Sequence, residues 1–317
     1  MAASKFEAFN AKNLTYRTIN GHPLKVAILT PKELDQQESN EYPILVHWHG
    51  GGFIAGHRLH EDWFALWLVE LALEKKAIII APDYRLLPEA KGTDILEDVD
   101  HFWTWMTSDL VSVSESWHAR PDLSKILCCG QSSGGWLSVQ SAILCPQSNI
   151  KAIISISAPL NADVPQLTVP APRTIMGTPA RSPGQAAAAI RSYKKSIRPG
   201  AVRTVGDPTE MWDMVLSVAQ QGALARFLGT KEDKRLDIMS GFDKVDKMPP
   251  IWAIHGQGDT IIPAICSLDF VVKLEKTLAG TPVHLTLESG DHSFDVGMHI
   301  GTSWVQKGCK FIEEWWP

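Results

Sequence analysis

Short apolar runs alternate with longer amphipathic stretches along most of the chain. The strand-like runs cover residues 14–19, 24–29, 43–48, 77–81, 126–129, 151–157, 251–255 and 283–287. The runs at residues 43–48 and 77–81 are almost wholly apolar, as expected for strands that helices cover on both faces. The first two runs are separated by Asn20-Gly21, a favoured hairpin turn. The pattern therefore predicts a sheet that begins with a hairpin and continues as buried, mostly parallel strands.

The stretches between these runs carry apolar residues at helical spacing. The predicted helices cover residues 61–75, 94–106, 136–144, 263–278 and 304–316. In the first of them, one side is expected to carry Trp63, Phe64, Trp67, Leu68 and Leu71. Strands and helices that alternate in this way predict an α/β fold with a doubly wound, mostly parallel sheet of eight strands.

The alternation stops between about residues 159 and 249, where no strong strand pattern occurs. Two N-cap residues there precede a proline and have Gln or Glu at the third helical position, in Ser182-Pro-Gly-Gln185 and Asp207-Pro-Thr-Glu210. This arrangement predicts two capped helices. Because the segment is too long for a simple crossover, we expect a core of residues 1–158 and 249–317. Residues 159–248 would then be a helical cap inserted after the sixth strand.

The composition argues against several classes of protein. The 317 residues carry a formal net charge of −5 with dispersed cations, so nothing favours binding to nucleic acid or to an anionic membrane surface. No apolar run approaches the ~20 residues that span a bilayer, and residues 1–7 lack the apolar core of a secretory signal. The five cysteines show neither CxxC nor Cys/His metal spacing. We interpret them as reduced core residues and expect a cytoplasmic protein without stable membrane insertion.

One short segment carries the strongest chemical signal. The apolar run 126–129 leads directly into Gly130-Gln-Ser132-Ser-Gly134, and a helix is predicted immediately afterwards. A Gly-x-Ser-x-Gly pattern between a strand and a helix is typical of a nucleophile elbow, in which the serine hydroxyl stands at the apex of a sharp turn. The glycines are required because a side chain there would collide with the neighbouring strand or helix. Ser132 is therefore the candidate nucleophile. The alternative, a phosphate-binding turn, lacks both a Walker lysine and the Gly-x-Gly-x-x-Gly spacing.

A serine nucleophile needs a base, and the base needs a third group that orients it. In an open α/β sheet such groups come from loops at the carboxyl ends of strands. His292 follows the last predicted strand and Asp259 follows the one before it, which gives the order serine, acid, histidine that this pattern requires. Asp291 and Asp295 flank His292 and are rival acids, although their position suits a role within the loop itself. We predict a catalytic triad of Ser132, Asp259 and His292.

A glycine run after the third predicted strand supplies the remaining part of the site. Acyl transfer passes through a tetrahedral oxyanion, and each N–H donor aimed at it contributes a factor of about 10²–10³ in rate. The run His49-Gly-Gly51-Gly52 matches the motif that supplies these donors in esterases. We expect the N–H groups of Gly51, Gly52 and Ser133 to form the oxyanion hole. His47 and His49 alternate on one side of the strand, but no third ligand is placed beside them, so we predict no metal site.

These motifs and two further ones resemble one branch of a known family. His49-Gly-Gly-Gly-Phe53, Asp83-Tyr-Arg-Leu-Leu-Pro-Glu89, Glu97-Asp-Val99 and Gly130-Gln-Ser-Ser-Gly-Gly135 occur in this order and look like the hormone-sensitive-lipase-like branch of the α/β-hydrolases. The resemblance covers about residues 14–158 and 249–317 and implies carboxylic ester hydrolysis without a cofactor. It also implies that the Asp83–Arg85 segment supports the active-site loops. Gln131 and Ser133 stand where Asp and Ala are commoner, so Ser133 stays an alternative nucleophile.

The sequence thus predicts a serine carboxylesterase that acts through an acyl-enzyme on a small to medium, fairly apolar ester. The candidate pocket residues are Phe53, Met211, Trp212, Met214 and Phe227. For the last four, packing between cap and core is an equally good interpretation. The inserted segment, with its Gly206–Trp212 run, resembles that of secondary-metabolism hydrolases of filamentous fungi.

Three other functions could use the same site. A dehydratase or cyclase would polarise a carbonyl in the oxyanion hole and use His292 as a base without an acyl-enzyme. A thioesterase or amidase would release a product from a carrier protein. A non-catalytic receptor, like the gibberellin receptors of this fold, would lack the catalytic histidine, and the presence of His292 argues against it. The sequence is compatible with a homodimer but does not define the oligomeric state.

Overall fold

The computed structural model describes residues 4–316, and one eight-stranded sheet runs through it. The strands are β1 (Phe9–Ile19), β2 (His22–Pro31), β3 (Asn40–Trp48), β4 (Ile78–Pro82), β5 (Ala119–Gln131), β6 (Ile150–Ile156), β7 (Ile251–Gly256) and β8 (Val283–Glu288). Their order in the sheet is β1-β2-β4-β3-β5-β6-β7-β8. The β1–β2 and β2–β4 pairs are antiparallel, and the remaining pairs are parallel. The predicted mostly parallel, doubly wound sheet is confirmed.

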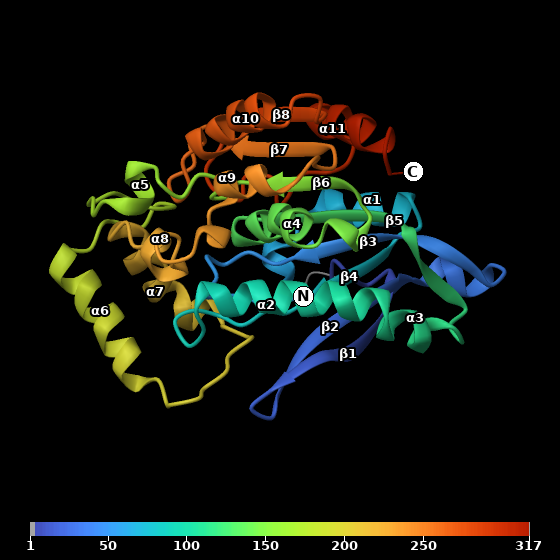
Figure 1. Cartoon of the computed structure of the whole chain (residues 1–317), viewed down its shortest axis with the longest axis horizontal. Helices are drawn as coiled ribbons and strands as arrows, with labels where there is room; N and C mark the ends of the chain where they lie inside the picture. Colours follow the sequence, from blue (N-terminus) through green and yellow to red (C-terminus); the bar gives the residue numbers. More distant parts are fainter. Residues whose placement is uncertain (1–3, 317) are drawn as a thin grey trace.

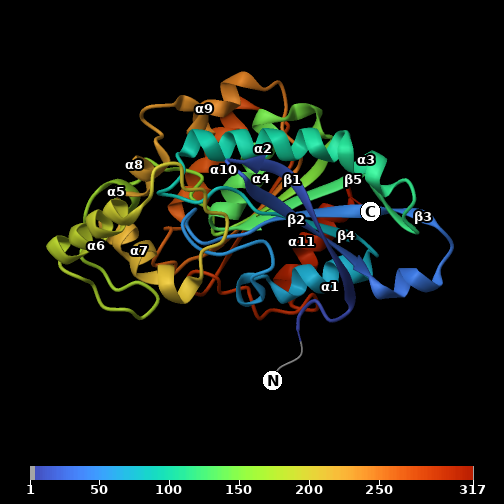
Figure 2. The same cartoon turned by 90° about the horizontal axis from the view of Figure 1, so that it is seen from below.

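Helices cover both faces of this sheet (Figure 1). They are α1 (Leu66–Glu74), α2 (Gly92–Thr107), α3 (Asp109–Ser114), α4 (Ser133–Leu144), α5 (Pro165–Thr168), α6 (Pro183–Ser196), α7 (Pro208–Gln220), α8 (Leu224–Leu228), α9 (Ile238–Gly241), α10 (Ile265–Thr277) and α11 (Ser303–Glu313). Short 3-10 turns are η1 (Lys32–Gln36), η2 (Glu61–Trp63), η3 (Pro146–Ser148), η4 (Lys234–Leu236) and η5 (Phe242–Lys244). Figure 2 shows α2, α4 and α10 over one face and α1 and α11 over the other. None of the helices within residues 4–316 is long and apolar enough to cross a membrane.

Each face of the sheet buries its own apolar layer. On β3, Ile44 and Val46 belong to the core beneath α2 and α4, whereas Leu45 belongs to the core beneath α1 and α11. Successive side chains of a strand point to opposite faces, so a strand that is covered on both faces must be apolar at every position. This requirement explains the nearly unbroken apolar runs in the sequence.

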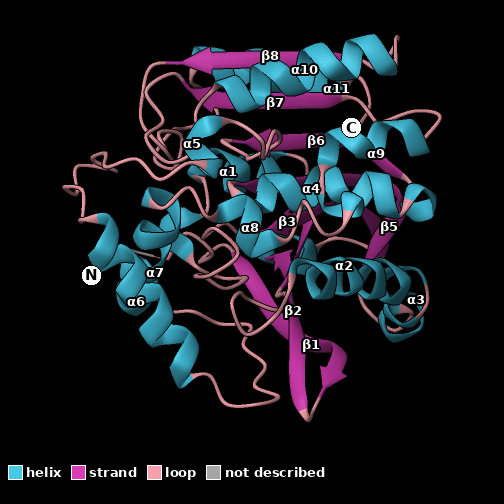
Figure 3. Ribbon diagram, turned by 60° about the vertical axis from the view of Figure 1, so that its left-hand side comes forward, coloured by secondary structure: helices cyan, strands magenta, loops and turns pink. Residues whose placement is uncertain are grey.

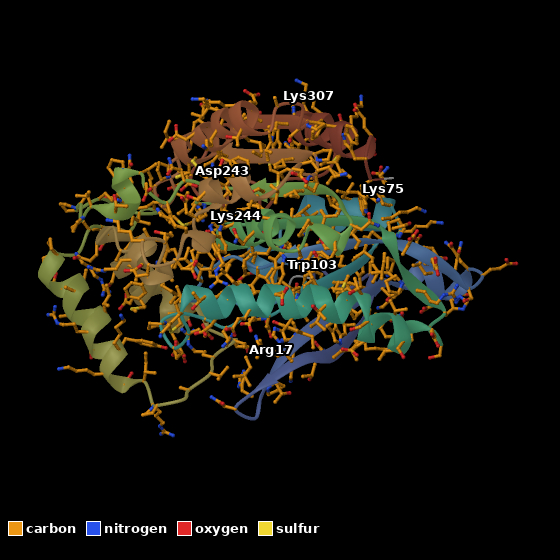
Figure 4. All side chains as sticks on the ribbon, in the orientation of Figure 1. Arg17, Lys75, Trp103, Asp243, Lys244 and Lys307 are labelled. Carbon is orange, nitrogen blue, oxygen red and sulfur yellow. The ribbon has the colours of Figure 1, made fainter. Side chains whose placement is uncertain are left out.

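The β1–β2 hairpin is fixed to the rest of the fold through Arg17. Its turn has the positive φ angles that a type I′ turn needs, 50° at Asn20 and 77° at Gly21. Figure 4 shows Arg17 between β1 and α2, and its Nη1 donates to Oδ1 of Asp98, 2.7 Å away. Arg85 donates to the same fully buried carboxylate. The carboxylate of Asp98 therefore joins the hairpin, α2 and the loop after β4.

The predicted helix over residues 61–75 is interrupted, which corrects the sequence-based boundary. Phe64 and Ala65 are extended, and α1 begins only at Leu66. The Leu66 N–H donates to the Val296 carbonyl at 3.0 Å, which ties the start of α1 to the loop after β8. Trp63 and Trp67 lie on either side of this break and pack in different layers. Trp63 packs against the core beneath α2 and α4, whereas Trp67 belongs to the core beneath α1 and α11.

The segment between β6 and β7 contains α5 to α9 and contributes no strand to the sheet within the described residues. Figures 1 and 3 show α5 to α8 at the side to which the arrowheads of β7 and β8 point, which is the carboxyl end of the parallel strands. Ser182 and Gln185 form the expected capping box at α6. At α7, Asp207 accepts from the Thr209 N–H at 2.8 Å, but no return bond from Glu210 accompanies it.

Candidate active site

Ser132 stands at a sharp turn between β5 and α4. Its backbone has φ 55° and ψ −121°, a conformation that residues other than glycine rarely adopt and that clusters at functional sites. The turn is held by the Ser132 N–H, which donates to the Ile156 carbonyl of β6 at 2.7 Å. A Cβ on Gly134 would collide with the Trp48 carbonyl, and one on Gly130 would collide with Gly134. These close approaches explain why the pattern needs glycine on both sides of the serine.

Asp259 and His292 lie together after β7 and β8. His292 Nδ1 is 2.7 Å from Asp259 Oδ2, and the carboxylate side chain is fully buried. Oδ1 of Asp259 accepts the N–H groups of Ile261 and Ile262 at 2.9 and 2.8 Å. The backbone therefore fixes one carboxylate oxygen while the other holds the imidazole in the tautomer that leaves Nε2 free to accept a proton.

The electrostatics of this pair favour an ionised carboxylate. Burial alone would raise the pKa of Asp259, but the adjacent imidazole of His292 and the hydrogen bonds to the carboxylate hold that pKa well below its ordinary value. An ionised acid is what a histidine base requires, because it stabilises the imidazolium that forms when the base takes a proton.

This depressed pKa predicts a pH-dependent contribution to stability. A carboxyl whose pKa is lower in the folded state stabilises the fold above its unfolded pKa, about 3.9, and loses that contribution as the pH falls toward the folded pKa. At pH 7, Asp259→Asn should lower the free energy of unfolding by about 1–3 kcal/mol. Urea unfolding of both proteins between pH 7 and pH 3 should show the difference shrinking below about pH 4. A difference that grows as the pH falls would contradict this assignment.

The two rival carboxylates serve other contacts. Asp291 Oδ1 accepts from the Thr260 N–H at 2.7 Å and from the backbone N–H of His292 at 2.7 Å. Asp295 is buried and accepts from the Trp67 indole at 3.1 Å. Within residues 4–316 neither of them is bonded to the His292 ring, so Asp259 is the acid that the geometry favours.

Ser132 and His292 line the same cavity, although no hydrogen bond joins them in the described part of the chain. Contacts of this kind are often long before a substrate binds. The alternative nucleophile, Ser133, is the first residue of α4, and its hydroxyl is 3.3 Å from the Tyr84 hydroxyl. Of the two serines, Ser132 alone has the strained backbone of an elbow apex.

The glycine loop after β3 presents unpaired backbone donors to this cavity. Gly51 and Gly52 have φ angles of 107° and 63°, and within residues 4–316 neither N–H has a hydrogen-bond partner. The loop closes on itself because the Gly51 carbonyl accepts from Ile54 and Ala55 at 3.0 and 2.9 Å. The Ser133 N–H stands at the start of α4, where N–H groups have no partner within the helix. All three residues line the cavity, as an oxyanion hole would require.

His47, near the end of β3, and His49, just after it, have structural roles. Burial lowers the pKa of His47 to about 4 and that of His49 to about 3, so both are neutral. His47 Nε2 lies 2.9 Å from Oε1 of Gln131, and His49 Nδ1 donates to the Gly50 carbonyl at 2.8 Å. The described residues contain no group of three or more His, Cys, Asp or Glu side chains that could hold a metal.

The segment after β4 supports the glycine loop from below. The Tyr84 ring stacks on His49 with centroids 4.4 Å apart, and its hydroxyl donates to the His49 carbonyl at 3.0 Å. Asp83 accepts from the Arg58 N–H at 2.9 Å and from the Arg58 guanidinium at 2.5 Å. These contacts are structural, and they hold the glycine loop in place.

The segment between β6 and β7 is bonded to the same loop. Gly56 and Gly206 exchange two backbone hydrogen bonds, at 2.7 and 3.0 Å. Arg203 donates to the carbonyls of Ile54 and Leu87, both at 2.6 Å, and pairs with Glu89 at 2.8 Å. This segment is therefore joined to the glycine loop by backbone hydrogen bonds and by Arg203, and to the loop after β4 by the Arg203–Glu89 ion pair.

The cavity at the site has a volume of about 90 Å³ and is predominantly apolar. Beyond the loop and triad residues its walls are Trp63, Pro159, Leu167, Met176, Trp212, Val215, Val218, Ala219, Leu224, Ile261 and Ile262. Most of these residues come from segments far apart in the sequence. No local pattern marks them as neighbours, and Trp63 in particular was expected inside a helix.

Phe53 and Trp212 line this cavity, but three of the expected pocket residues do not. On α7, the residues that line the cavity are Trp212, Val215, Val218 and Ala219, at helical spacings of three and four. Met211 and Met214 belong to the hydrophobic core and do not line the cavity. Phe227 on α8 packs beneath Lys194, whose Nζ is 4.7 Å from its ring. Val215 and Ala219 take the place of these residues at the wall.

Comparison with known proteins agrees with this fold. The alpha/beta hydrolase fold family matches residues 45–294. A probable carboxylesterase of a Phoma species is 46% identical over 315 residues, which cover 99% of this chain and 98% of the relative. A probable carboxylesterase of Cochliobolus lunatus is 50% identical over 188 residues, 59% of this chain and 86% of the relative. The solved structure of a Pyrobaculum calidifontis esterase, 21% identical, covers 96% of this chain and 85% of its own with a TM-score of 0.61.

A serine at a strand–helix elbow above a parallel sheet defines the class of serine hydrolases built on such sheets. The chain belongs to the α/β-hydrolase family, as its motifs predicted. It is a carboxylic ester hydrolase.

Proposed function

We propose that the chain hydrolyses carboxylic esters through an acyl-enzyme formed on Ser132. The observation that carries the proposal is the 2.7 Å pairing of His292 with the buried Asp259, at a cavity that Ser132 also lines. His292 takes the Ser132 proton as the hydroxyl attacks the ester carbonyl, and then gives it to the leaving alcohol. A water molecule, activated by the same histidine, releases the acid in the second half of the reaction.

The glycine loop stabilises the charge that develops in each half. The N–H groups of Gly51, Gly52 and Ser133 would receive the oxyanion of both tetrahedral intermediates. Two glycines with positive φ suit this task because a backbone without Cβ lets several N–H groups converge on one point.

The test of this mechanism is covalent labelling. A fluorophosphonate probe should modify the wild-type protein with a stoichiometry of about one, and peptide mass spectrometry should place the label on Ser132. His292→Ala, which removes the base and leaves the hydroxyl, should label at least about 10²-fold more slowly. A label on Ser133, or none at all, would contradict the proposal.

The substrate that we propose is a small, apolar ester. The cavity has a volume of only about 90 Å³, which suits a short acyl group better than a long one. Its apolar walls offer few partners for a charged substrate. We therefore expect kcat/KM for p-nitrophenyl esters to be highest for short acyl chains and to fall for long ones.

One substitution on α7 tests which wall sets this limit. Ala219→Trp fills the cavity and should lower kcat/KM for the hexanoate at least about tenfold, since excluding even a methylene or two changes binding by ~1–3 kcal/mol. The acetate should change by less than about threefold. Ala188→Trp, the same change at an exposed position of α6, should alter neither ester. If Ala219→Trp lowered kcat/KM equally for both esters, the substitution would be disrupting the catalytic groups and not only reducing the size of the cavity.

Residues 159–248 are proposed to act as a cap over this cavity, because α7 supplies one of its walls. A reducing compartment such as the cytosol suits the five cysteines, which are all buried and unpaired. Acyl thioesters assayed beside the oxygen esters would detect release from a carrier, and a dehydratase or cyclase would consume neither.

A further inference from the structure

A second histidine lies directly beneath the acid of the site. His255 is the fifth residue of β7 and is fully buried. Its Nε2 is 2.9 Å from the Ile262 carbonyl and 3.4 Å from Asp259 Oδ2. Its Nδ1 is 2.7 Å from the Ser267 hydroxyl on α10. One ring therefore touches the acid, the turn that follows the acid, and the helix behind that turn.

The partners of this ring fix its tautomer. A carbonyl and an ionised carboxylate can only accept, so Nε2 must carry a proton and donate toward Ile262 and Asp259. The Ser267 hydroxyl can then donate to Nδ1. His255 thus has a hydrogen-bond partner at both ring nitrogens.

The turn between Asp259 and Ile262 is held from two sides. Its N–H groups bond to Oδ1 of Asp259, as described above, while its last carbonyl bonds to His255. The other carboxylate oxygen, Oδ2, receives His292 at 2.7 Å and faces His255 at 3.4 Å. The direction in which Oδ2 points is therefore set by a closed ring of contacts, and His255 is the member that links it to α10.

We propose that His255 is a positioning residue for ester hydrolysis, which holds the acid turn so that Asp259 keeps its bond to His292. The proposal rests on the roles proposed above for Ser132, Asp259 and His292. His255 itself touches neither the cavity nor the reacting atoms.

Within residues 4–316, Asp259 is the only carboxylate within 4 Å of a His255 ring nitrogen. On the loops, His292 bonds to the same oxygen of Asp259, Oδ2, and Asp291 bonds to Thr260. On α10, the buried Cys266 thiol contacts the Asn161 carbonyl, and Asp269 accepts from the Asn161 amide at 2.8 Å. A change in the acid–base behaviour of the site on altering His255 would therefore pass through Asp259.

Two amide substitutions separate the contacts of the ring. The His255→Gln amide reaches the position of Nε2, so it can still donate to the turn and the acid. The His255→Asn amide reaches only the position of Nδ1. It therefore keeps its contact with Ser267 but loses the hydrogen bond to the Ile262 carbonyl and the contact with Asp259. The two variants have similar polarity, and neither can titrate, so they differ chiefly in the contact that the proposal concerns.

We expect His255→Asn to lower kcat by about 10–100-fold with KM within about threefold, since small displacements of a catalytic group can cost ~10² in rate. A weaker Asp259–His292 bond gives less support to the imidazolium, so the acidic limb of the kcat/KM profile should move to lower pH by about half a unit or more. His255→Gln should restore kcat to within about threefold of the wild type and return the limb to its place. His284→Asn, on β8 near Trp252 and Phe311 of the other layer, should change neither.

Rates are expressed per active site titrated with the fluorophosphonate, so a poorly folding variant does not imitate a slow one. The proposal is overturned if His255→Asn keeps kcat within twofold, if its acidic limb stays in place or moves to higher pH, or if His255→Gln is impaired as much as His255→Asn. Ser132→Ala is assayed in parallel. If Ser132→Ala is active, the proposed function fails. If it is inactive and the two amides behave alike, the role of His255 alone fails.

Discussion

Replacing Ser132 by alanine should reduce ester hydrolysis by about 10⁴-fold or more, because removal of a serine nucleophile leaves only the oxyanion hole and binding to act. The side chain lost is a single hydroxyl at the apex of the elbow, so the fold should be kept. The measurement is kcat/KM for p-nitrophenyl butanoate, with thermal unfolding of the same samples.

The matched control is Ser138→Ala, which removes a buried hydroxyl from α4, the helix that follows Ser132. Its Oγ donates to the Gly134 carbonyl at 2.9 Å and does not line the cavity. Stability should fall slightly, and activity should stay within about threefold of the wild type. If Ser132→Ala kept substantial activity, Ser133 or a mechanism without an acyl-enzyme would replace the one proposed here.

Substituting Gly51 by alanine is expected to have the second largest effect. A Cβ there would lie within 2.6 Å of the Ala55 carbonyl carbon and 2.9 Å from Cζ3 of Trp63, on a backbone with φ 107°. The loop cannot accept this side chain without moving, and movement would displace the N–H donors. We expect kcat to fall by about 10²–10³-fold, the effect of losing one oxyanion donor.

Gly280→Ala provides the control for backbone strain. Gly280 has φ 95°, and a Cβ there would meet nothing within 4 Å. It should lower the melting temperature because alanine disfavours positive φ, yet leave kcat unchanged. Equal activity losses at Gly51 and Gly280 would mean that strain alone, and not the position of the loop, accounts for the effect.

The sheet and the elbow at Ser132 could be predicted because their signals are local. A strand covered on both faces is apolar at most of its positions, so β3 to β6 are visible as largely apolar runs such as Ile44 to Trp48. The elbow likewise needs glycine at fixed positions around Ser132, because the backbones there nearly touch. In both cases a short stretch of sequence carries the whole physical requirement.

The cavity and the second histidine could not be predicted because their neighbours come from distant segments. Trp63 lines the cavity where the predicted helix is broken after it, and the Leu66 N–H beyond the break bonds to Val296, about 230 residues away in the sequence. Val215 rather than Met214 faces the site because of how α7 is rotated on the core. Helical periodicity gives the sides of α7 but not which side points inward.

The two hydrogen bonds between Gly56 and Gly206 use backbone atoms alone. Side chains on α7 can therefore change during evolution without breaking these two hydrogen bonds. Substitutions at positions 212, 215 and 219, in natural variants or laboratory libraries, should change which esters fit the cavity while the glycine loop keeps its anchor. In this architecture, adapting to a new substrate and preserving the chemistry are largely separate problems.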